Sequence, residues 1–251
     1  SGLLIHINDM RRILPLALAG ALLCLSGCLS VNRMDVSPVE TPKKIPLSDF
    51  TYILGDDPYP FVGSFRRADG SLIGGGSLIQ PTVVLTAGHV VDSDDVDYYY
   101  IGGVQHQIDR IVLHEKYKPW ETLDWILYDI AIVFLCEPSE VTPVELAGEQ
   151  DEVYKGMSLT TVGYGRGFKR HSNPGVFWYY GRLIKEPWEI QMLPTQSTVW
   201  FGDSGGALLA NGKQIGIISS FSMRQGKIYE NSCTSVDYFR EWIESECSLV
   251  E

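Results

Sequence analysis

Residues 202–207 read Gly-Asp-Ser-Gly-Gly-Ala and place a serine among residues with small side chains. A serine hydroxyl attacks a carbonyl carbon slowly at neutral pH unless a neighbouring base removes its proton. The chain offers such a base in His89, within Thr-Ala-Gly-His-Val, and a carboxylate to orient that base in Asp129, within Tyr-Asp-Ile-Ala-Ile-Val. The types and order of His89, Asp129 and Ser204 therefore indicate acyl transfer through a serine nucleophile.

Each of the three segments also has a purely structural explanation when it is taken alone. A Gly-Asp-Ser-Gly-Gly segment is often only a turn. A histidine after Ala-Gly is often a surface or core residue, and an aspartate before an apolar run often caps a strand. Short motifs give many false matches, but three of them in this order favour a Ser-His-Asp triad.

Together the segments resemble the chymotrypsin/trypsin family of serine peptidases, which reads roughly TAAHC, DIAL and GDSGGP at these places. The chain order His, Asp, Ser separates this family from subtilisins and α/β-hydrolases. The resemblance runs from about residue 53 to residue 247 and includes further segments in the family's order. These are residues 75–79, 112–117, 162–165 and 216–219, followed by a final segment that carries Trp242.

The resemblance implies a serine endopeptidase with a protein or peptide substrate and no cofactor. Ser204 would be the nucleophile, His89 the general base and then acid, and Asp129 the residue that holds the imidazole tautomer. The backbone N–H groups of Gly202 and Ser204 would form the oxyanion hole, and glycine suits residue 202 because its amide must turn toward the substrate. A catalytically silent binding or adhesion lipoprotein on the same fold, and a serine esterase, are the alternatives.

Short apolar runs separated by Gly, Pro, Asp and Asn predict an all-β fold. The expected strands lie at residues 60–65, 72–79, 83–87, 98–101, 107–113, 130–135, 157–163, 175–184, 207–209 and 215–220. Phe239, Trp242 and Ile243 have helical spacing and predict an amphipathic C-terminal helix over residues 237–246. The family's two antiparallel six-stranded β-barrels, packed together, fit this pattern, with a peptidase domain at residues 53–251.

The N-terminal segment has the pattern of an export signal. Residues 10–12, Met-Arg-Arg, precede an apolar run at residues 13–25 that is too short to span a bilayer. The Leu-Ser-Gly-Cys that ends at Cys28 resembles the lipobox of bacterial lipoproteins, in which the cysteine becomes the lipidated first residue. An ordinary signal peptide that contains a cysteine is the alternative.

We therefore expect residues 1–27 to be upstream residues and a lipoprotein signal peptide, with residues 1–9 outside the fold. Residues 28–52 are expected to be a tether or propeptide, because they hold several prolines and lysines but few large apolar side chains. The expected location is the bacterial cell envelope, anchored to a membrane through Cys28. Leu29 is not the aspartate that often retains lipoproteins at the inner membrane, which favours the outer membrane or periplasm.

The formal net charge of −11 argues against nucleic-acid binding, for which a basic patch is expected. The acidic run at residues 92–97 lacks the central glycine and distal glutamate of a calcium loop, so it is interpreted as a solvated loop. Residues 102–107, where the family's calcium-binding loop falls, carry no carboxylate. The sequence therefore predicts no metal site.

The expected domain contains Cys136, Cys233 and Cys247. The positions of the family's disulfides beside the histidine and the serine carry other residues, namely Gly74, Val90, Trp200 and Ala210. A bridge between Cys233 and Cys247 stays open, as does the alternative that both are small buried hydrophobic residues.

Substrate preference depends on the residue six positions before the serine, which lies at the base of the S1 pocket in this family. Trypsins have an aspartate there, whereas this chain has Thr198. Ser219, Ser220 and Phe221 are expected to form one wall of the pocket, and residues 231–233 the opposite wall. Phe221 and Asn231 would narrow the pocket, so we expect a small or medium uncharged residue on the N-terminal side of the scissile bond, the P1 residue.

Activation is the remaining expectation. In the family, a freed N-terminal Ile or Val pairs its ammonium with the aspartate before the serine, here Asp203. Ile53, in Ile-Leu-Gly-Asp, resembles that terminus, but Tyr52 precedes it in place of Arg or Lys. An Asp203–Ile53 ion pair after cleavage is one expectation and activity without cleavage is the other, because a buried Asp203 needs some partner. A cut before Ile53 would also separate the domain from Cys28.

Overall fold

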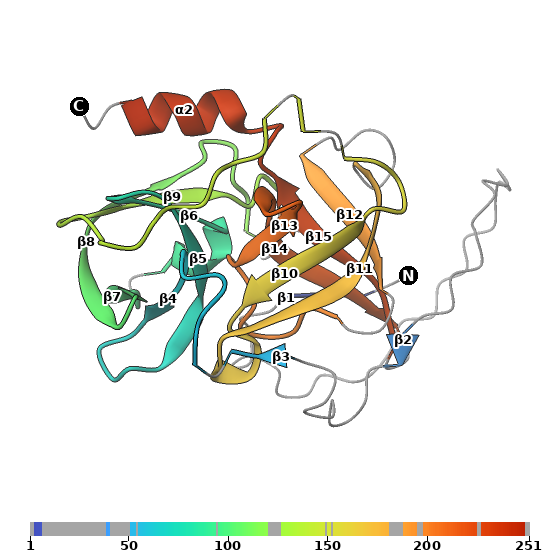
Figure 1. Ribbon diagram of the computed structural model, residues 1–251, viewed down its shortest axis with the longest axis horizontal. Coiled ribbons are helices and arrows are strands. Elements are labelled where there is room, and N and C mark those ends of the chain that lie inside the picture. Colours follow the sequence, from blue (N-terminus) through green and yellow to red (C-terminus); the bar gives the residue numbers. More distant parts are fainter. Residues whose placement is uncertain are drawn as a thin grey trace, which may run out of the picture.

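The computed structural model describes residues 3–6, 39–40, 51–53, 55–93, 95–119, 127–148, 150–151, 153–180, 188–194, 198–224 and 227–248. Two antiparallel β-barrels lie side by side, the first at the left and the second at the right of Figure 1, with a short C-terminal helix above them. This is the fold class that the sequence predicts. The proposed lipidation site at Cys28 and most of residues 1–52 lie outside the described residues.

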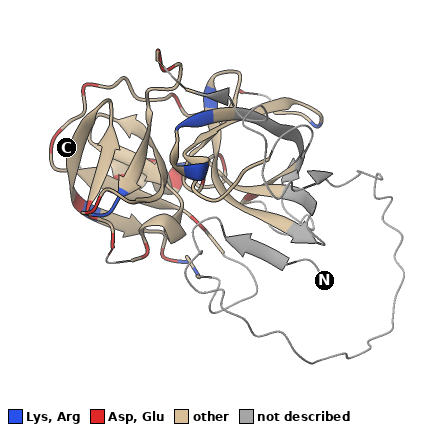
Figure 2. Cartoon of the chain, turned by 90° about the horizontal axis from the view of Figure 1, so that it is seen from below, with Lys and Arg blue, Asp and Glu red and all other residues tan. Residues whose placement is uncertain are grey.

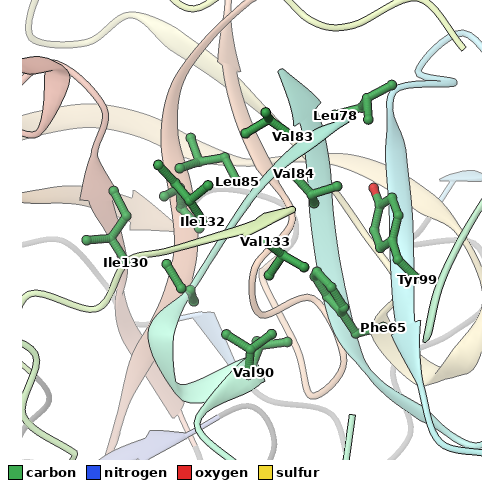
Figure 3. Packing of buried hydrophobic residues seen from close by; sticks show 14 of the residues in the cluster. Phe65, Leu78, Val83, Val84, Leu85, Val90, Tyr99, Ile130, Ile132 and Val133 are labelled. Carbon is green, nitrogen blue, oxygen red and sulfur yellow. The ribbon is translucent and has the colours of Figure 1, made fainter. Parts of the chain in front are cut away.

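The first barrel is closed by six strands in the order β4, β5, β6, β9, β8 and β7. Their bounds are β4 Val62–Arg66, β5 Leu72–Gln80, β6 Val83–Thr86, β7 Tyr98–Ile101, β8 Val104–Leu113 and β9 Ala131–Leu135. All residues of β6 and β9 are buried, and their Val, Ile, Leu and Phe side chains suit a pleated core surface. Figure 3 shows these side chains meeting Phe65 and Val90 inside the barrel.

Tyr99 places a polar hydroxyl in this apolar core, and the hydroxyl has hydrogen-bond partners there. Its ring is fully buried and lies 4.8 Å from that of Phe65, between ring centroids. Its hydroxyl accepts a hydrogen bond from the N–H of Gly63 and donates one to the carbonyl oxygen of Gly76, both at 2.9 Å. A buried phenol is tolerated because both of its hydrogen-bonding functions have partners.

The second barrel is closed by pairings that run through β10, β11, β12, β15, β14 and β13 and back to β10. Their bounds are β10 Ser158–Gly163, β11 Arg170–Tyr180, β12 Glu189–Pro194, β13 Ala207–Ala210, β14 Lys213–Arg224 and β15 Lys227–Ser235. The core of this barrel includes Leu159, Ile190, Leu208, Ile218 and Cys233. Two of its strands, β12 and β15, were not among the expected ones.

Three short strands from the N-terminal part of the chain add to the second barrel. They are β1 Leu3–His6, which pairs with β14, β2 Val39–Glu40, which pairs with β15, and β3 Thr51–Tyr52, which pairs with β11. Residues 3–6, which lie within the expected upstream segment, are thus paired with the second barrel in this structure. The unpaired edge of β14 accepts them because any extended segment can complete a ladder of backbone hydrogen bonds.

The C-terminal helix α2, Arg240–Ser248, returns the chain to the first barrel. Ile243 is buried in the core cluster of the first barrel, and Trp242 and Cys247 pack against that cluster. The other helical segments are α1, Gly88–Val91, and a 3-10 turn at Gly165–Gly167. In the part of the chain that the structure describes, no helix combines the length and apolar character needed to cross a membrane.

The three described cysteines are free. Cys233 is buried in the core of the second barrel, whereas Cys247 packs against the core of the first barrel. Cys136 is exposed. The structure therefore favours the interpretation of Cys233 and Cys247 as separate apolar residues over a bridge between them.

Candidate active site

A chain of hydrogen bonds joins Asp129, His89 and Ser204 where the two barrels meet. His89 Nδ1 lies 2.8 Å from Asp129 Oδ2, and His89 Nε2 lies 2.9 Å from Ser204 Oγ. The backbone N–H of His89 also donates to Asp129 Oδ1 at 3.0 Å. If the Nδ1 proton faces the carboxylate, Nε2 is left to accept the serine proton, which is the arrangement that activates a hydroxyl.

The three side chains come from three different elements. His89 lies in α1, directly after β6, and Asp129 immediately precedes Ile130 and β9 of the first barrel. Ser204 lies in the turn before β13 of the second barrel. Strands β6 and β9 are neighbours, with Thr86 opposite Ala131, so the histidine and the aspartate emerge at the same end of the first barrel.

Asp129 is held by groups from the second barrel as well. The Ser219 hydroxyl donates to Asp129 Oδ2 at 2.5 Å, and the Thr234 hydroxyl donates to the Asp129 carbonyl oxygen at 2.8 Å. Burial by itself raises the pKa of Asp129, but the charge of His89 and the hydrogen bonds from His89 and Ser219 outweigh it and lower the pKa to about 2. Asp129 is therefore a carboxylate at neutral pH.

Tyr128, just before Asp129, has an unusual backbone conformation with φ of +50°. This region disfavours side chains with a Cβ atom. Its ring is stacked between His114, at a centroid distance of 5.3 Å, and Trp188, at 4.8 Å. The stack holds Tyr128 in place while the backbone turns Asp129 toward His89. No local sequence pattern indicates this support, because the residues of the stack are far apart in the chain.

The turn that carries Ser204 depends on two glycines with left-handed backbone angles. Gly202 has φ of +99°, and a Cβ atom there would lie 2.7 Å from the Tyr164 carbonyl oxygen. Gly205 has φ of +78° and donates from its N–H to the Ile218 carbonyl oxygen at 2.8 Å. Among the described residues, no hydrogen bond occupies the N–H groups of Gly202 and Ser204. Both amides are thus available to bind an oxyanion.

In the uncut chain, Asp203 has a different partner from the Ile53 ammonium that is expected after cleavage. Asp203 is paired with Arg170, whose Nη2 atom contacts Asp203 Oδ2. Ile53 is instead part of the continuous chain, and its N–H donates to the Lys169 carbonyl oxygen at 3.1 Å. A peptide N–H carries no positive charge, so it cannot replace the arginine. Arg170 had no signal in the sequence, because it lies 33 residues from Asp203.

The residues expected to form the S1 pocket come together in part. The Thr198 hydroxyl donates to Asn231 Oδ1 at 2.7 Å, and both side chains are buried. Phe221 is also fully buried, with its ring stacked on Trp200 at a centroid distance of 5.8 Å. Ser220 is buried as well. The Ser219 hydroxyl contacts Asp129, so this side chain also positions the acid.

Potential metal ligands do not gather in the part of the chain that the structure describes. Within the described ranges, no group of three or more His, Cys, Asp or Glu side chains lies close enough together to hold a metal ion. The polar groups described at the site are the hydrogen-bonded Asp129, His89 and Ser204 and the amides beside the serine.

Comparisons with known proteins identify the family of the chain. The family model described as Trypsin matches residues 55–243. The chain is 27% identical to Trypsin epsilon of Drosophila erecta over 220 residues, which are 75% of this chain and 82% of that protein. It is 25% identical to the vitellin-degrading protease of Bombyx mori over 254 residues, 86% of this chain and 92% of that protein. Both relatives are insect proteins, so the bacterial origin and the lipoprotein signal stay predictions.

Solved structures share the fold at low sequence identity. A mutant of human heparin binding protein is similar with a TM-score of 0.68 and 20% identity, over 80% of this chain and 97% of that chain. Neuropsin, a serine protease expressed in the limbic system of mouse brain, gives a TM-score of 0.66 and 18% identity, over 79% and 98%. These likenesses show the fold alone. The family model spans well over half of the sequence, and the chain therefore belongs to the trypsin family of serine peptidases.

Proposed function

We propose that this protein is a serine endopeptidase whose catalytic triad is Ser204, His89 and Asp129. The observation that carries the proposal is the unbroken hydrogen-bond chain from Asp129 Oδ2 through both ring nitrogens of His89 to Ser204 Oγ. A family member that has lost activity is not expected to retain all three groups at hydrogen-bonding distance.

The geometry supports a two-step acyl transfer. Ser204 Oγ attacks the peptide carbonyl carbon while its proton moves to His89 Nε2, and the carbonyl oxygen becomes an oxyanion beside the amides of Gly202 and Ser204. The C–N bond then breaks, and the amine leaves with the proton from His89. In the second step, water attacks the acyl carbon while His89 takes its proton; the bond to Ser204 Oγ then breaks, and His89 returns the proton to that oxygen. Asp129 stabilises the charged imidazole throughout.

An extended peptide is the substrate form that the fold accommodates best. Residues 3–6 already lie along one edge of β14, with Leu3 opposite Met223 and His6 opposite Ser220 in antiparallel register. A peptide in this place would run alongside Ser220 toward Ser219, whose hydroxyl contacts Asp129. Strand addition of this kind supplies backbone hydrogen bonds that a small ester cannot use. Comparison of turnover of matched amide and ester substrates tests the esterase alternative.

We propose a P1 preference for small or medium uncharged residues. Thr198, at the base of the expected pocket, donates a hydrogen bond to Asn231 of the expected wall, and neither side chain carries a charge. Asn231 Nδ2 has no hydrogen-bond partner among the described residues. The Phe221 ring stacks on Trp200 and would narrow the expected pocket on one side. Profiling with a peptide library should give cleavage after uncharged residues. Strong cleavage after Arg or Lys would overturn this preference.

We further propose that the enzyme is exported and anchored in a bacterial cell envelope through a lipid on Cys28. The support is the lipobox-like sequence at residues 25–28 after a short apolar run. Mass spectrometry of the mature N-terminal peptide should find a lipidated Cys28. The Cys28→Ser variant should leave the membrane fraction, and retention of that variant with the membrane would contradict the anchor.

A catalytically silent binding protein is the second candidate, because human heparin binding protein has a similar fold. This chain differs from a polyanion-binding protein in its net charge of −11. Figure 2 shows its Asp and Glu residues mainly on loops of the described part. An uncharged or basic partner would fit such a surface better.

A fluorophosphonate probe separates the enzyme from the silent protein. The probe reacts only with a serine that is activated as a nucleophile, so the wild-type protein should be labelled and Ser204→Ala should not. The Ser77→Ala variant is the control, since Ser77 is a buried serine of β5 whose hydroxyl has no hydrogen-bond partner among the described residues. Absence of labelling in both wild type and control would favour the binding protein.

A further inference from the structure

We infer that Arg170 supplies, from within the chain, the positive charge that this family obtains from a freed N-terminus, so that the uncut chain is already active. The inference rests on the proposed peptidase function and concerns its regulation. It predicts that cleavage between Tyr52 and Ile53 is unnecessary.

The first support is the closed environment of the Arg170–Asp203 pair. Both side chains are almost fully buried, at 2% and 3% exposure. Asp203 Oδ1 accepts a hydrogen bond from the N–H of Gly165 at 2.7 Å, and Oδ2 accepts one from the N–H of Trp200 at 2.8 Å. Arginine stays protonated in proteins, so it neutralises the carboxylate at every working pH. A second cation at this place would be left buried without a counter-charge.

The second support is the space left by two glycines of β10 and the turn after it. A Cβ atom at Gly163 would lie 2.6 Å from Asp203 Oδ1. A Cβ atom at Gly165 would lie 2.8 Å from the Arg170 Cζ atom and still closer to two nitrogens of its guanidinium. Any other residue at these two positions would displace the pair. Glycine at residues 163 and 165 therefore leaves the space that the Arg170–Asp203 pair occupies.

The third support is the position of the chain around Ile53. Strand β3 pairs with β11, with Tyr52 opposite Arg170 and Thr51 opposite His171. The Ile53 N–H extends this ladder to the Lys169 carbonyl oxygen. The bond between Tyr52 and Ile53 thus lies within a hydrogen-bonded ladder, where a protease would have to withdraw it before cutting.

The pair acts on the reaction through the backbone. Asp203 lies between Gly202 and Ser204, whose N–H groups would bind the oxyanion. Its own N–H donates to the Trp200 carbonyl oxygen, and its carbonyl oxygen accepts from the Gly206 N–H, both at 3.0 Å. With the carboxylate fixed by Arg170, the peptide groups on both sides of Asp203 are fixed as well. Arg170 is accordingly a positioning residue that does not touch the substrate.

The decisive measurement is the intact mass of protein labelled by a fluorophosphonate probe. We expect the adduct on chains that retain residues 28–52. An adduct found only on chains that begin at Ile53 would overturn the inference and leave the proposed function standing. Protein produced to begin at Ile53 supplies the cut form directly, and we expect its kcat not to exceed that of the uncut chain. If neither the cut nor the uncut form is labelled, the proposed function fails and the inference fails with it.

Substitution of Arg170 tests its positioning role. We expect Arg170→Met to lower kcat on the order of 100-fold, as does the loss of one oxyanion-hole donor, with a small change in KM. Arg170→Lys should recover part of the loss, and Arg166→Met, an exposed arginine in the preceding turn, should leave kcat unchanged. If Arg170→Met fails to fold, the Arg170→Met/Asp203→Asn pair removes both charges together and should fold with low kcat. A folded Arg170 variant with wild-type kcat would overturn the inference.

Discussion

The Ser219 hydroxyl donates a hydrogen bond to Asp129 Oδ2 across 2.5 Å and so ties a residue of the second barrel to the acid of the first. The Thr234 hydroxyl makes a second link of this kind, to the Asp129 carbonyl oxygen. The relative position of the barrels is therefore coupled to the orientation of His89. Because the site is assembled from two barrels, such links help to keep Asp129, His89 and Ser204 within hydrogen-bonding distance of one another.

Removal of the Ser219 hydroxyl should lower activity without unfolding the protein. We expect Ser219→Ala to reduce kcat/KM about tenfold, because a hydrogen bond to a charged group contributes about 1.5–3 kcal/mol and part of it orients the imidazole. Steady-state kinetics on a peptide substrate measures the effect. Ser77→Ala removes a buried hydroxyl away from Asp129 and should change kcat/KM little. Equal kinetics in the two variants would contradict the role given to Ser219.

Stability at acid pH should depend on Asp129. Its pKa is about 2 in the folded protein and 3.8 in an unfolded chain, so its carboxylate stabilises the fold above about pH 4. The difference corresponds to roughly 2 kcal/mol, which is lost as the pH falls from about 4 to about 2. Chemical denaturation at several pH values measures this. The Asp129→Asn variant should have a lower free energy of unfolding at neutral pH, and this free energy should change less between pH 4 and pH 2 than that of wild type. If it changes as much as in wild type, other carboxylates dominate the acid sensitivity.

The sequence predicted those parts of the molecule whose signals are local. The strands around the candidate triad were expected within one or two residues of β6, β9 and β13, since their apolar runs are buried on all residues. Strand β15 was missed because its sequence, Lys-Ile-Tyr-Glu-Asn-Ser-Cys-Thr-Ser, is largely polar and becomes a strand only by pairing with β12 and β14. Arg170 was missed for a similar reason, since its partner is distant in the chain.

The space above Gly165 provides a test of packing around the buried ion pair. Gly165→Ala places a methyl group against the Arg170 guanidinium, so we expect a loss of about 1–3 kcal/mol in unfolding free energy and a lower kcat. Gly156→Ala is the control, because that glycine has φ of +87° and no atom within 4 Å of a new Cβ, so it loses only about 1 kcal/mol to backbone strain. Thermal unfolding and kcat should be measured together. A fall in stability at Gly165 with unchanged kcat would separate the packing from the active site.

The described cysteines should differ in their reaction with a thiol reagent. Cys136 is exposed, whereas burial raises the pKa of Cys247 to about 11 and raises that of Cys233 further. Because the thiolate is the reactive form, native protein should be modified first at Cys136. Peptide mapping after a short exposure to the reagent measures this, with guanidinium-unfolded protein as the control in which all sites react. Early loss of Cys233 would show that the second barrel opens readily.

In protein that retains residues 1–27, strand β1 lies on the edge of β14 that an extended substrate would use, so it should compete with that substrate. A chain that begins at Met10 lacks Leu3–His6 and should bind peptides with a lower KM at unchanged kcat. If β1 occupies the edge in two thirds of the molecules, KM falls about threefold, because apparent affinity scales with the open fraction.

The Ile5→Pro variant tests the same edge with the chain length preserved. Residue 5 lies opposite Phe221, and proline there removes a backbone donor and disfavours the strand. The KM of this variant should match that of the shortened chain, and its melting temperature should match that of wild type, because β1 adds only an outer strand. Identical KM values in wild type, Ile5→Pro and the shortened chain would show that substrates bind elsewhere than at the β14 edge.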